Sequence, residues 1–346
     1  MLSSTAPPGY KGGEGLFLFR KHVFSIIVGF GFMLVLKKVD YEILFKLSKP
    51  LFFGSIVLLL MVFFKGLGVK GGGAYRWIRI APGFAFQPAE LLKLTMVIYT
   101  ASFLCRKRDV LDDFKKGFLP LALLTFGAAA ILLAQPDMGT AIVVIGVSVM
   151  LWWVGGMRTL RIIKVLILLA ILGFLFIWIE PYRRERILAF LNPWAAPHGF
   201  GYQIIQALLA FGVGGFWGVG LGKGLQKFYY LPAPHTDFIF AVIGEELGFL
   251  GSIVVLALYV VMGWASFSIS RRAQTCFGKL LGMGITFLIL LQALVNLGGV
   301  TNFTPSTGIP LPFVSYGGSS MVVSLSCVGI LLSIASKGRE EEKSGF

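Results

Sequence analysis

The sequence predicts an all-α polytopic membrane protein that forms a single transmembrane domain over residues 1–346. Hydrophobic residues make up 56% of the chain and charged residues 14%, whereas a soluble domain carries about 25% charged residues. The apolar residues form runs of about 17–25, long enough for helices that cross a bilayer. These runs are apolar on every face, as expected of helices in lipid. We find nine of them: 23–36, 51–69, 88–105, 118–134, 139–155, 163–180, 238–264, 280–298 and 319–336.

Charge and cysteine content exclude two other classes of protein. The net charge is +15, but the basic residues lie between the apolar runs and do not line one face of a fold. A nucleic-acid-binding protein is therefore not expected. The three cysteines, Cys105, Cys276 and Cys327, lie in or beside apolar runs without metal-ligand spacing. They predict neither a disulfide framework nor a zinc site.

The distribution of basic residues predicts the orientation in the membrane. More than half of the 31 Lys and Arg residues lie in one set of short alternate loops, while the 299–318 loop has none. By the positive-inside rule the basic set is cytoplasmic, so the C-terminus is inside and nine spans place the N-terminus outside. The beginning of the chain, Met1 to Ser4, has no charged segment before an apolar one and is no signal peptide. We therefore expect that a first span is missing or that an internal methionine was taken as the start.

The first two outward connections carry three charged residues of interest. Glu90 and Lys93 are three residues apart at the start of a span and share one helix face, where they form either a local anchoring ion pair or a functional pair. Asp137 precedes the next outward end of a span. For Asp137, capping that helix is favoured over chemistry.

The 181–237 segment is the largest outward loop, and its glycines suggest a re-entrant stretch. Residues 220–223 do not form a phosphate-binding P-loop, because Trp217 replaces the first glycine and no Ser or Thr follows Lys223. Residues 202–211 predict a short interfacial helix.

Asp237 is the strongest catalytic candidate, because it lies where the span near residue 238 begins, beside His235 and Thr236. It could cap that helix, or it could act as a base near the basic residues of the same face. His198 and His235 lack the spacing of a metal site. Glu245 and Glu246 lie about two helical turns deeper and are expected to form structural ion pairs rather than to react.

The 299–318 loop contains two prolines and two glycines at its end, at positions 310, 312, 317 and 318. This composition predicts a broken helix that is buried in protein or lines a wet cavity.

Five motifs resemble those of the SEDS family (shape, elongation, division and sporulation), the family of FtsW, RodA and SpoVE. They occur in the family's order along nearly the whole chain, and residues 243–246 are most similar to the FtsW branch. The motifs are QPAE at 87–90, AQPDMG at 134–139, NPW at 192–194, YLPAPHTDFIFAVIGEELG at 230–248 and LPFVSYGGSS at 311–320.

The resemblance implies a ten-helix bundle, of which this chain lacks the first helix. It implies a peptidoglycan glycosyltransferase of the bacterial inner membrane that polymerises lipid II at the division septum, with its active site on the outer face. Undecaprenyl diphosphate would be the leaving group. Asp237 matches the family's essential aspartate and would be the general base. A lipid II flippase, a RodA-like elongation polymerase and a transpeptidase scaffold remain alternatives.

The resemblance further implies a divalent cation (Mg or Mn), no nucleotide cofactor, and as partners a class B penicillin-binding protein and other division proteins. No metal ligands can be assigned from the sequence. Arg184 is a further candidate for the diphosphate. The candidate substrate-binding residues are Glu90, Lys93, Asp137, Arg183, Arg186, Lys223, Lys227, His235 and Ser315.

Overall fold

The computed structural model describes residues 14–64, 66–71, 74–81, 84–179, 181–195, 199–225 and 236–344. These residues fall into two compact units, each built from separate stretches of the chain. The first unit comprises Met1–Phe24, Lys164–Met262 and Gln292–Gly317, and the second comprises Ser25–Ile163, Gly263–Leu291 and Gly318–Phe346. Several long helices belong to both units.

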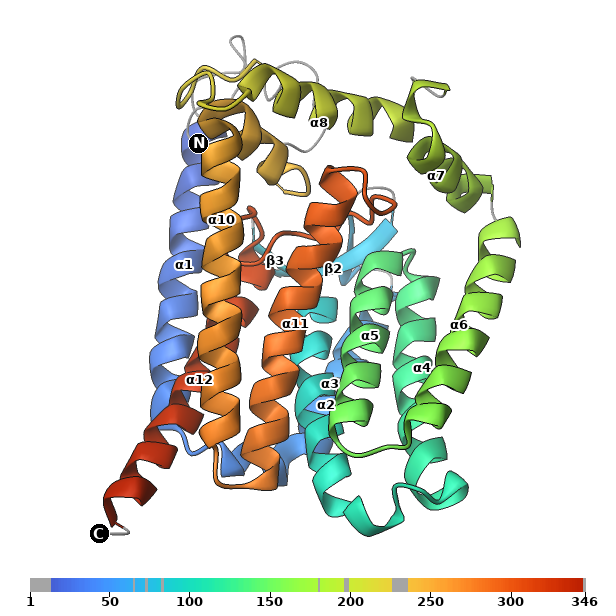
Figure 1. The fold of residues 1–346 in the computed structure, drawn as a ribbon, viewed down its shortest axis with the longest axis vertical. Coiled ribbons are helices and arrows are strands. Elements are labelled where there is room, and N and C mark those ends of the chain that lie inside the picture. Colours follow the sequence, from blue (N-terminus) through green and yellow to red (C-terminus); the bar gives the residue numbers. More distant parts are fainter. Residues whose placement is uncertain are drawn as a thin grey trace. The chain divides into compact units, whose positions relative to one another are not determined.

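Each of the nine predicted apolar runs overlaps a helix (Figure 1). In the described part of the chain, seven helices are long and apolar enough to cross a membrane, and α5 is a shorter apolar helix. The chain is therefore an integral membrane protein, as predicted. The nine helices are α1 (Glu14–Lys38), α2 (Glu42–Met61), α3 (Pro88–Arg106), α4 (Leu119–Ala134), α5 (Met138–Val154), α6 (Thr159–Ile179), α10 (Ile239–Arg272), α11 (Cys276–Val300) and α12 (Gly318–Ser344).

The predicted run 51–69 is displaced from the helix that forms. α2 begins at Glu42 and ends at Met61. Lys46 and Lys49, which precede the predicted run and were expected in a loop, are therefore helical. The apolar sequence continues past Met61, but the backbone turns and Gly66 adopts a φ of +99°, which is strained for residues other than glycine. Hydrophobicity marks burial or lipid contact and does not by itself mark where a helix ends.

A small antiparallel sheet follows α2, in a connection where no strand was predicted. Its strands are β1 (Gly68–Gly71), β2 (Ala74–Ala81) and β3 (Phe84–Phe86), paired in that order. Val69 lies opposite Trp77. Tyr, Trp and Ile in β2 favour a strand, and this signal was present in the sequence.

α3 forms the core of the second unit. Within its most apolar 18-residue window 83% of residues are buried, compared with 22% in α2. It contacts α2, α4, α5 and α12. Hydroxyl pairs join α2 to α3: Ser55 Oγ lies 2.7 Å from Thr95 Oγ1, and Ser48 Oγ donates to Ser102 Oγ over 2.9 Å. Small polar residues of this kind are typical of close helix packing in membranes.

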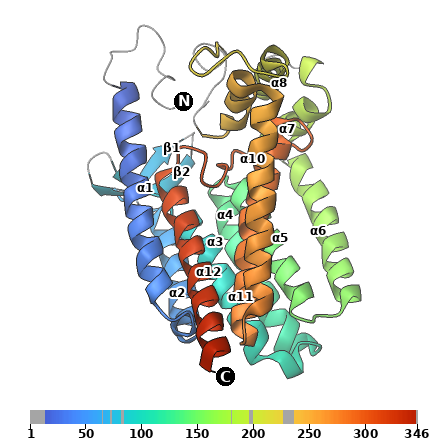
Figure 2. The same cartoon turned by 60° about the vertical axis from the view of Figure 1, so that its left-hand side comes forward.

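Within the second unit α1 and α12 lie side by side (Figure 2). Their approach depends on a glycine, because a Cβ on Gly329 would lie 2.6 Å from the carbonyl oxygen of Met33. A side chain at this position would push the two helices apart.

A disulfide joins Cys105, near the end of α3, to Cys276, at the start of α11. The expectation that the cysteines form no disulfide was therefore wrong. The two residues are 171 positions apart in the sequence but have a Cα–Cα distance of 6.1 Å, within the range that a disulfide requires. Only the helix packing brings them together. Cys327 is buried and not disulfide-bonded.

In the first unit the segment after α6 forms α7 (Pro181–Leu191), the 3-10 turn η4 (Pro193–Ala195) and α8 (Phe200–Gly214), with α7 against α8 (Figure 1). The helix predicted at 202–211 is confirmed by α8. Two short helical turns, η2 (Arg108–Val110) and η3 (Phe114–Phe118), precede α4 in the second unit.

The glycine-rich stretch after α8 lies against a break in α10. The backbone N–H groups of Val219 and Gly220 donate to the carbonyls of Glu245 and Glu246, each over 3.0 Å. At the break Gly248 has a φ of +66°, and a Cβ there would lie 2.4 Å from Gly218 N. Both the conformation and the contact therefore require glycine.

Candidate functional site

Asp237 lies in the turn that leads into α10, and it lines a cavity of about 50 Å³ in the first unit. The walls come from α7, α8, the start of α10, the end of α11 and the irregular segment that follows α11. The polar lining residues are Arg186, Gln203, Asp237, Asn296, Ser306 and Thr307, and the remaining ones are Phe238, Val295, Gly299, Val300, Gly308 and Ile309.

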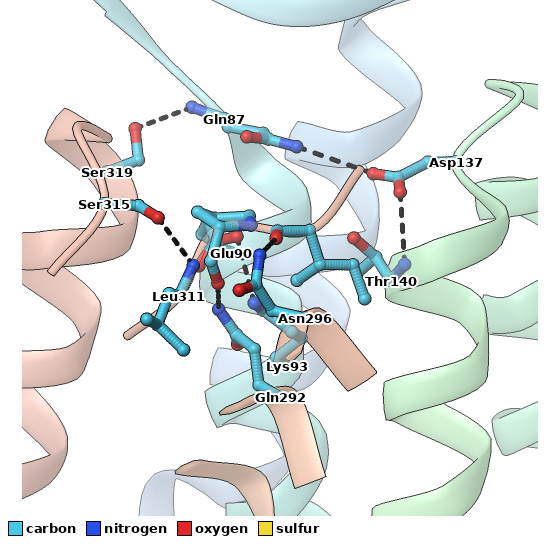
Figure 3. A network of polar contacts seen from close by, with 12 residues as sticks. Gln87, Glu90, Lys93, Asp137, Thr140, Gln292, Asn296, Leu311, Ser315 and Ser319 are labelled. Atoms are coloured by element: carbon cyan, nitrogen blue, oxygen red, sulfur yellow. Dashed lines mark hydrogen bonds and ion pairs between the residues drawn. The ribbon is translucent and has the colours of Figure 1, made fainter. Parts of the chain in front are cut away.

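Asn296 fixes the backbone at Asp237. Its Nδ2 donates to the carbonyl oxygen of Asp237 over 2.8 Å and to that of Ile309 over 2.7 Å. The side chain thus joins α11 to the Asp237 turn and to the irregular segment. One turn earlier, Gln292 Nε2 donates to the carbonyl oxygen of Pro310 over 2.9 Å. Both amides are labelled in Figure 3.

Ser315 supports the same turn from the end of the irregular segment. Its Oγ accepts from the backbone N–H of Leu311 over 2.7 Å and donates to the carbonyl oxygen of Thr236, the neighbour of Asp237. Ser315 is buried. Ser315 was predicted to be a substrate-binding residue. The structure shows it holding backbone groups beside Asp237, and it is not among the residues that line the cavity.

Arg186 is the basic candidate that the structure places beside Asp237. It lies on α7, lines the same cavity, and its Nη1 donates to the carbonyl oxygen of Ser306 over 3.1 Å. The guanidinium of Arg186 and the carboxylate of Asp237 thus give one cavity a fixed cation and a carboxyl group. The cavity can therefore receive both a group that loses a proton and a group that carries negative charge.

Glu90 and Lys93 form the predicted ion pair in the second unit, with Lys93 Nζ 2.9 Å from Glu90 Oε1 (Figure 3). Both residues are 2% exposed. The pair lies in the first two turns of α3, the most buried helix of that unit. The predicted pair is therefore enclosed by protein.

Asp137 is the N-cap of α5, as favoured from the sequence. Its Oδ1 accepts from the backbone N–H of Thr140 over 3.1 Å, and its Oδ2 accepts from Gln87 Nε2 over 3.4 Å (Figure 3). Arg76 of β2 holds the turn before it by donating from Nε to the carbonyl oxygen of Gln135 over 3.2 Å. The role of Arg76 could not be inferred, because nothing local in the sequence links the strand to this turn.

Of the other predicted site residues, Lys223 lies away from the cavity, and Lys227 and His235 lie outside the described residues. Lys223 is exposed in a turn closed by its own backbone N–H to the carbonyl of Gly220, and it does not line the cavity. Glu245 is buried, and its Oε1 accepts from the backbone N–H of Leu225 over 2.7 Å. Of Arg183 only the backbone, in α7, is described. The residues outside the described part are His198, Lys227 and His235.

Sequence reasoning missed Gln292 and Asn296. Both lie in the apolar span 280–298, spaced four residues apart, and so share one helix face. Amides within a membrane span are costly unless they have partners, and this was a usable signal. Gln203 was missed without such a signal, because a glutamine is ordinary in a helix that is predicted to lie at the membrane interface.

The described residues contain no cluster of three or more His, Cys, Asp or Glu side chains that could hold a metal ion. Asp237 is the sole carboxylate among the described residues that line the cavity. One carboxylate does not make a protein site for Mg²⁺, which usually also takes water and substrate phosphate oxygens. The described residues of the cavity therefore do not by themselves form a site for a divalent cation.

Fold and site together define an integral membrane protein with a small polar cavity that is lined by one arginine and one carboxylate among its described residues. A family model described as "Cell cycle protein", of the FtsW, RodA and SpoVE group, matches residues 2–340. The chain belongs to this family, the SEDS proteins, as its motifs predicted.

Relatives and solved structures agree with this assignment. A Geobacter sulfurreducens protein named "Probable peptidoglycan glycosyltransferase FtsW" is 44% identical over 94% of this chain and 87% of its own length. "Stage V sporulation protein E" of Bacillus subtilis is 39% identical over 95% and 90%.

Two solved structures cover almost the same length. One, described as "Structural coordination of polymerization and crosslinking by a peptidoglycan synthase complex", matches with a TM-score of 0.79 and 31% identity over 93% of this chain and 90% of that one. The other, the rod shape determining protein RodA of Thermus thermophilus, has a TM-score of 0.69 and 28% identity over 97% and 91%. The membrane fold is thus shared along nearly the whole chain.

Proposed function

We propose that this chain is a peptidoglycan glycosyltransferase that polymerises lipid II into glycan strands during septal cell-wall synthesis, with Asp237 as the general base. The observation that carries the proposal is the cavity that Asp237 and Arg186 both line. The family assignment supplies the reaction, since relatives that match nearly the whole chain are named as peptidoglycan glycosyltransferases.

In the proposed reaction Asp237 accepts the proton of the 4-hydroxyl of the acceptor GlcNAc. The oxygen attacks the anomeric carbon of the donor MurNAc and forms the new glycosidic bond. The bond from that carbon to the diphosphate oxygen breaks with inversion, and undecaprenyl diphosphate leaves with the electron pair. The proton remains on the Asp237 carboxyl until it passes to solvent.

The departing diphosphate gains negative charge, which a fixed cation in a water-poor cavity stabilises. Arg186 is the described cationic residue that lines the cavity, and its hydrogen bond to Ser306 holds it in place. A divalent cation (Mg or Mn) could add to this stabilisation if the diphosphate brought it, because phosphate oxygens are good ligands for such ions. The proposed reaction needs no nucleotide cofactor, since lipid II carries its own leaving group.

Rigid placement of the base supports this role. Asn296 holds the carbonyl of Asp237, and Ser315 holds the carbonyl of Thr236. A base whose backbone is fixed on both sides loses little freedom when the acceptor sugar arrives.

We further propose that the protein lies in the bacterial inner membrane at the division septum, with its C-terminus in the cytoplasm and the Asp237 cavity on the outer face. The positive-inside pattern supports this orientation. A class B penicillin-binding protein is the proposed partner, because a similar structure belongs to a complex that combines polymerisation with crosslinking.

The test is a polymerisation assay with purified protein, its transpeptidase partner and lipid II in detergent. Wild type should make glycan chains, and Asp237→Asn should reduce the rate by about 10²–10⁴-fold, the usual contribution of a general base. Asp109→Asn is the matched control, since Asp109 is exposed in η2, and it should polymerise normally.

Absence of chains from wild type with partner bound would overturn the enzyme assignment. It would favour a flippase or a scaffold, which vesicle-based lipid II transport and partner binding would separate. Equal rates for wild type and Asp237→Asn would remove Asp237 from the chemistry.

A further inference from the structure

Two residues that line the cavity beside Asp237, Asn296 and Thr307, each have a buried polar atom without a hydrogen-bond partner among the described residues, Asn296 Oδ1 and Thr307 Oγ1. Asn296 is 4% exposed. Its amide orientation is fixed, because turning it over would place its oxygen against the carbonyls of Asp237 and Ile309. Oδ1 is therefore a committed acceptor. A buried acceptor left without a donor is costly, so a ligand that supplies one is expected to bind there.

Gly308 keeps space open next to the Asp237 carboxylate. Its φ is +73°, and a Cβ at this position would meet Asp237 Oδ2 at 3.4 Å. A side chain here would occupy the volume through which a ligand reaches the carboxylate. The backbone of the irregular segment thus forms one wall of the cavity without filling it.

The pattern of donors and acceptors selects the class of ligand. Asn296 Oδ1 needs a hydrogen-bond donor, whereas Thr307 Oγ1 can donate or accept. A diphosphate offers only acceptors and would repel Asn296 Oδ1. Hydroxyl groups both donate and accept. A volume of about 50 Å³ holds roughly three to five waters, enough for the hydroxyl-bearing edge of one sugar ring but not for the ring.

We propose that Asn296 and Thr307 bind a hydroxyl of the acceptor sugar that neighbours the attacking 4-hydroxyl. This inference rests on the proposed function and adds a recognition site for the acceptor. The neighbouring group is the 3-hydroxyl or the 6-hydroxyl of GlcNAc. Its O–H donates to Asn296 Oδ1, and its oxygen accepts from Thr307 Oγ1, which orients the 4-hydroxyl toward Asp237.

The test measures a single coupling. The donor is lipid II whose GlcNAc lacks the 4-hydroxyl, so that it cannot act as an acceptor. The acceptors are lipid II analogues with normal GlcNAc, 3-deoxy-GlcNAc or 6-deoxy-GlcNAc, each with a non-cleavable phosphonate in place of the anomeric phosphate, so that they cannot act as donors. Thr307→Val removes the hydroxyl at nearly constant volume. Loss of one neutral hydrogen bond should lower kcat/KM for the normal acceptor by about 3–10-fold.

The decisive result is the dependence on substrate. Thr307→Val should lose its defect with the deoxy acceptor that lacks the bound hydroxyl and keep it with the other, which identifies the hydroxyl. Asn296→Leu should show the same dependence on the acceptor. It should also lower kcat with every acceptor, because it removes the hydrogen bond from Asn296 Nδ2 to the carbonyl oxygen of Asp237. Thr304→Val is the matched control, since Thr304 in the same segment also has a buried hydroxyl without a partner among the described residues but does not line the cavity. It should match wild type with all acceptors.

Equal defects of Thr307→Val with all three acceptors, or no defect with any, would overturn the hydroxyl site while wild type still couples donor to acceptor. No coupling by wild type would instead reject the proposed function. The wild-type measurements with deoxy acceptors add a check that needs no variant. If neither analogue lowers the rate, the site does not recognise these hydroxyls.

Discussion

The buried ion pair in α3 allows a quantitative test of the structure. Lys93 Nζ and Glu90 Oε1 are 2.9 Å apart, with side-chain exposures of 1% and 3%. Arg158 and Asp112 form a pair of the same length whose side chains are 72% and 47% exposed. The two pairs therefore have the same N–O distance, but one is buried and the other is exposed. We expect burial to dominate the difference between their contributions to stability.

Replacing Lys93 by Met leaves the Glu90 carboxylate without its lysine in the protein core. Removing one partner of a buried pair costs about 3–5 kcal/mol, whereas an exposed pair contributes about 0–1 kcal/mol because water screens it. Lys93→Met should therefore lower the free energy of unfolding by several times as much as Arg158→Met. The double variant Glu90→Leu with Lys93→Met removes both charges and should recover most of the loss.

The measurement is reversible unfolding in mixed detergent followed by helical circular dichroism, on wild type, each single variant and the double variant. The double-mutant cycle should give a coupling energy of about 3 kcal/mol or more. If Lys93→Met costs no more than Arg158→Met, or if the losses from Glu90→Leu and Lys93→Met simply add, the pair is not buried as the structure places it.

Three further predictions concern the rest of the fold. Gly248→Ala should lower the free energy of unfolding by about 1–3 kcal/mol, because Gly248 has a positive φ and lies close to Gly218. Gly212 has open space around it, so Gly212→Ala should have little effect. Thermal unfolding of both variants measures the difference, and equal losses would contradict the prediction. The hydrogen bond from Lys337 lowers the pKa of Asp40 below its ordinary 3.8, so this contact stabilises the fold above about pH 4 and is lost as the pH falls through the folded pKa. Lys337→Met should cost about 0–1 kcal/mol at pH 7 and less at pH 2, where more of Asp40 is protonated, and a cost that does not change with pH would contradict the assignment. Thiol titration in denaturant, on protein purified without reductant, should detect Cys327 alone and then all three cysteines after reduction; three reactive thiols before reduction would exclude the disulfide.

The sequence could predict the features that depend on local composition. Apolar runs located nine helices of the described part of the chain, seven of which are long and apolar enough to cross a membrane. A helix that spans a bilayer needs about twenty apolar residues in a row and makes its own backbone hydrogen bonds, so local composition marks it. Capping by Asp137 and the pair of Glu90 and Lys93 were also predictable, because both join residues three apart on one helix. The boundary of α2 was not predictable from hydrophobicity, since the apolar run continues into the turn before β1.

What the sequence determined by itself was the membrane class, the helix order and the family motif around Asp237. What only the tertiary structure decided was the neighbourhood of that aspartate. Arg186, Asn296 and Thr307 come from separate stretches of the chain and line one cavity with it, and Cys105 meets Cys276 across 171 residues. These contacts depend on how helices pack and how an irregular segment folds back on α11, and no local pattern of residue types records such long-range geometry.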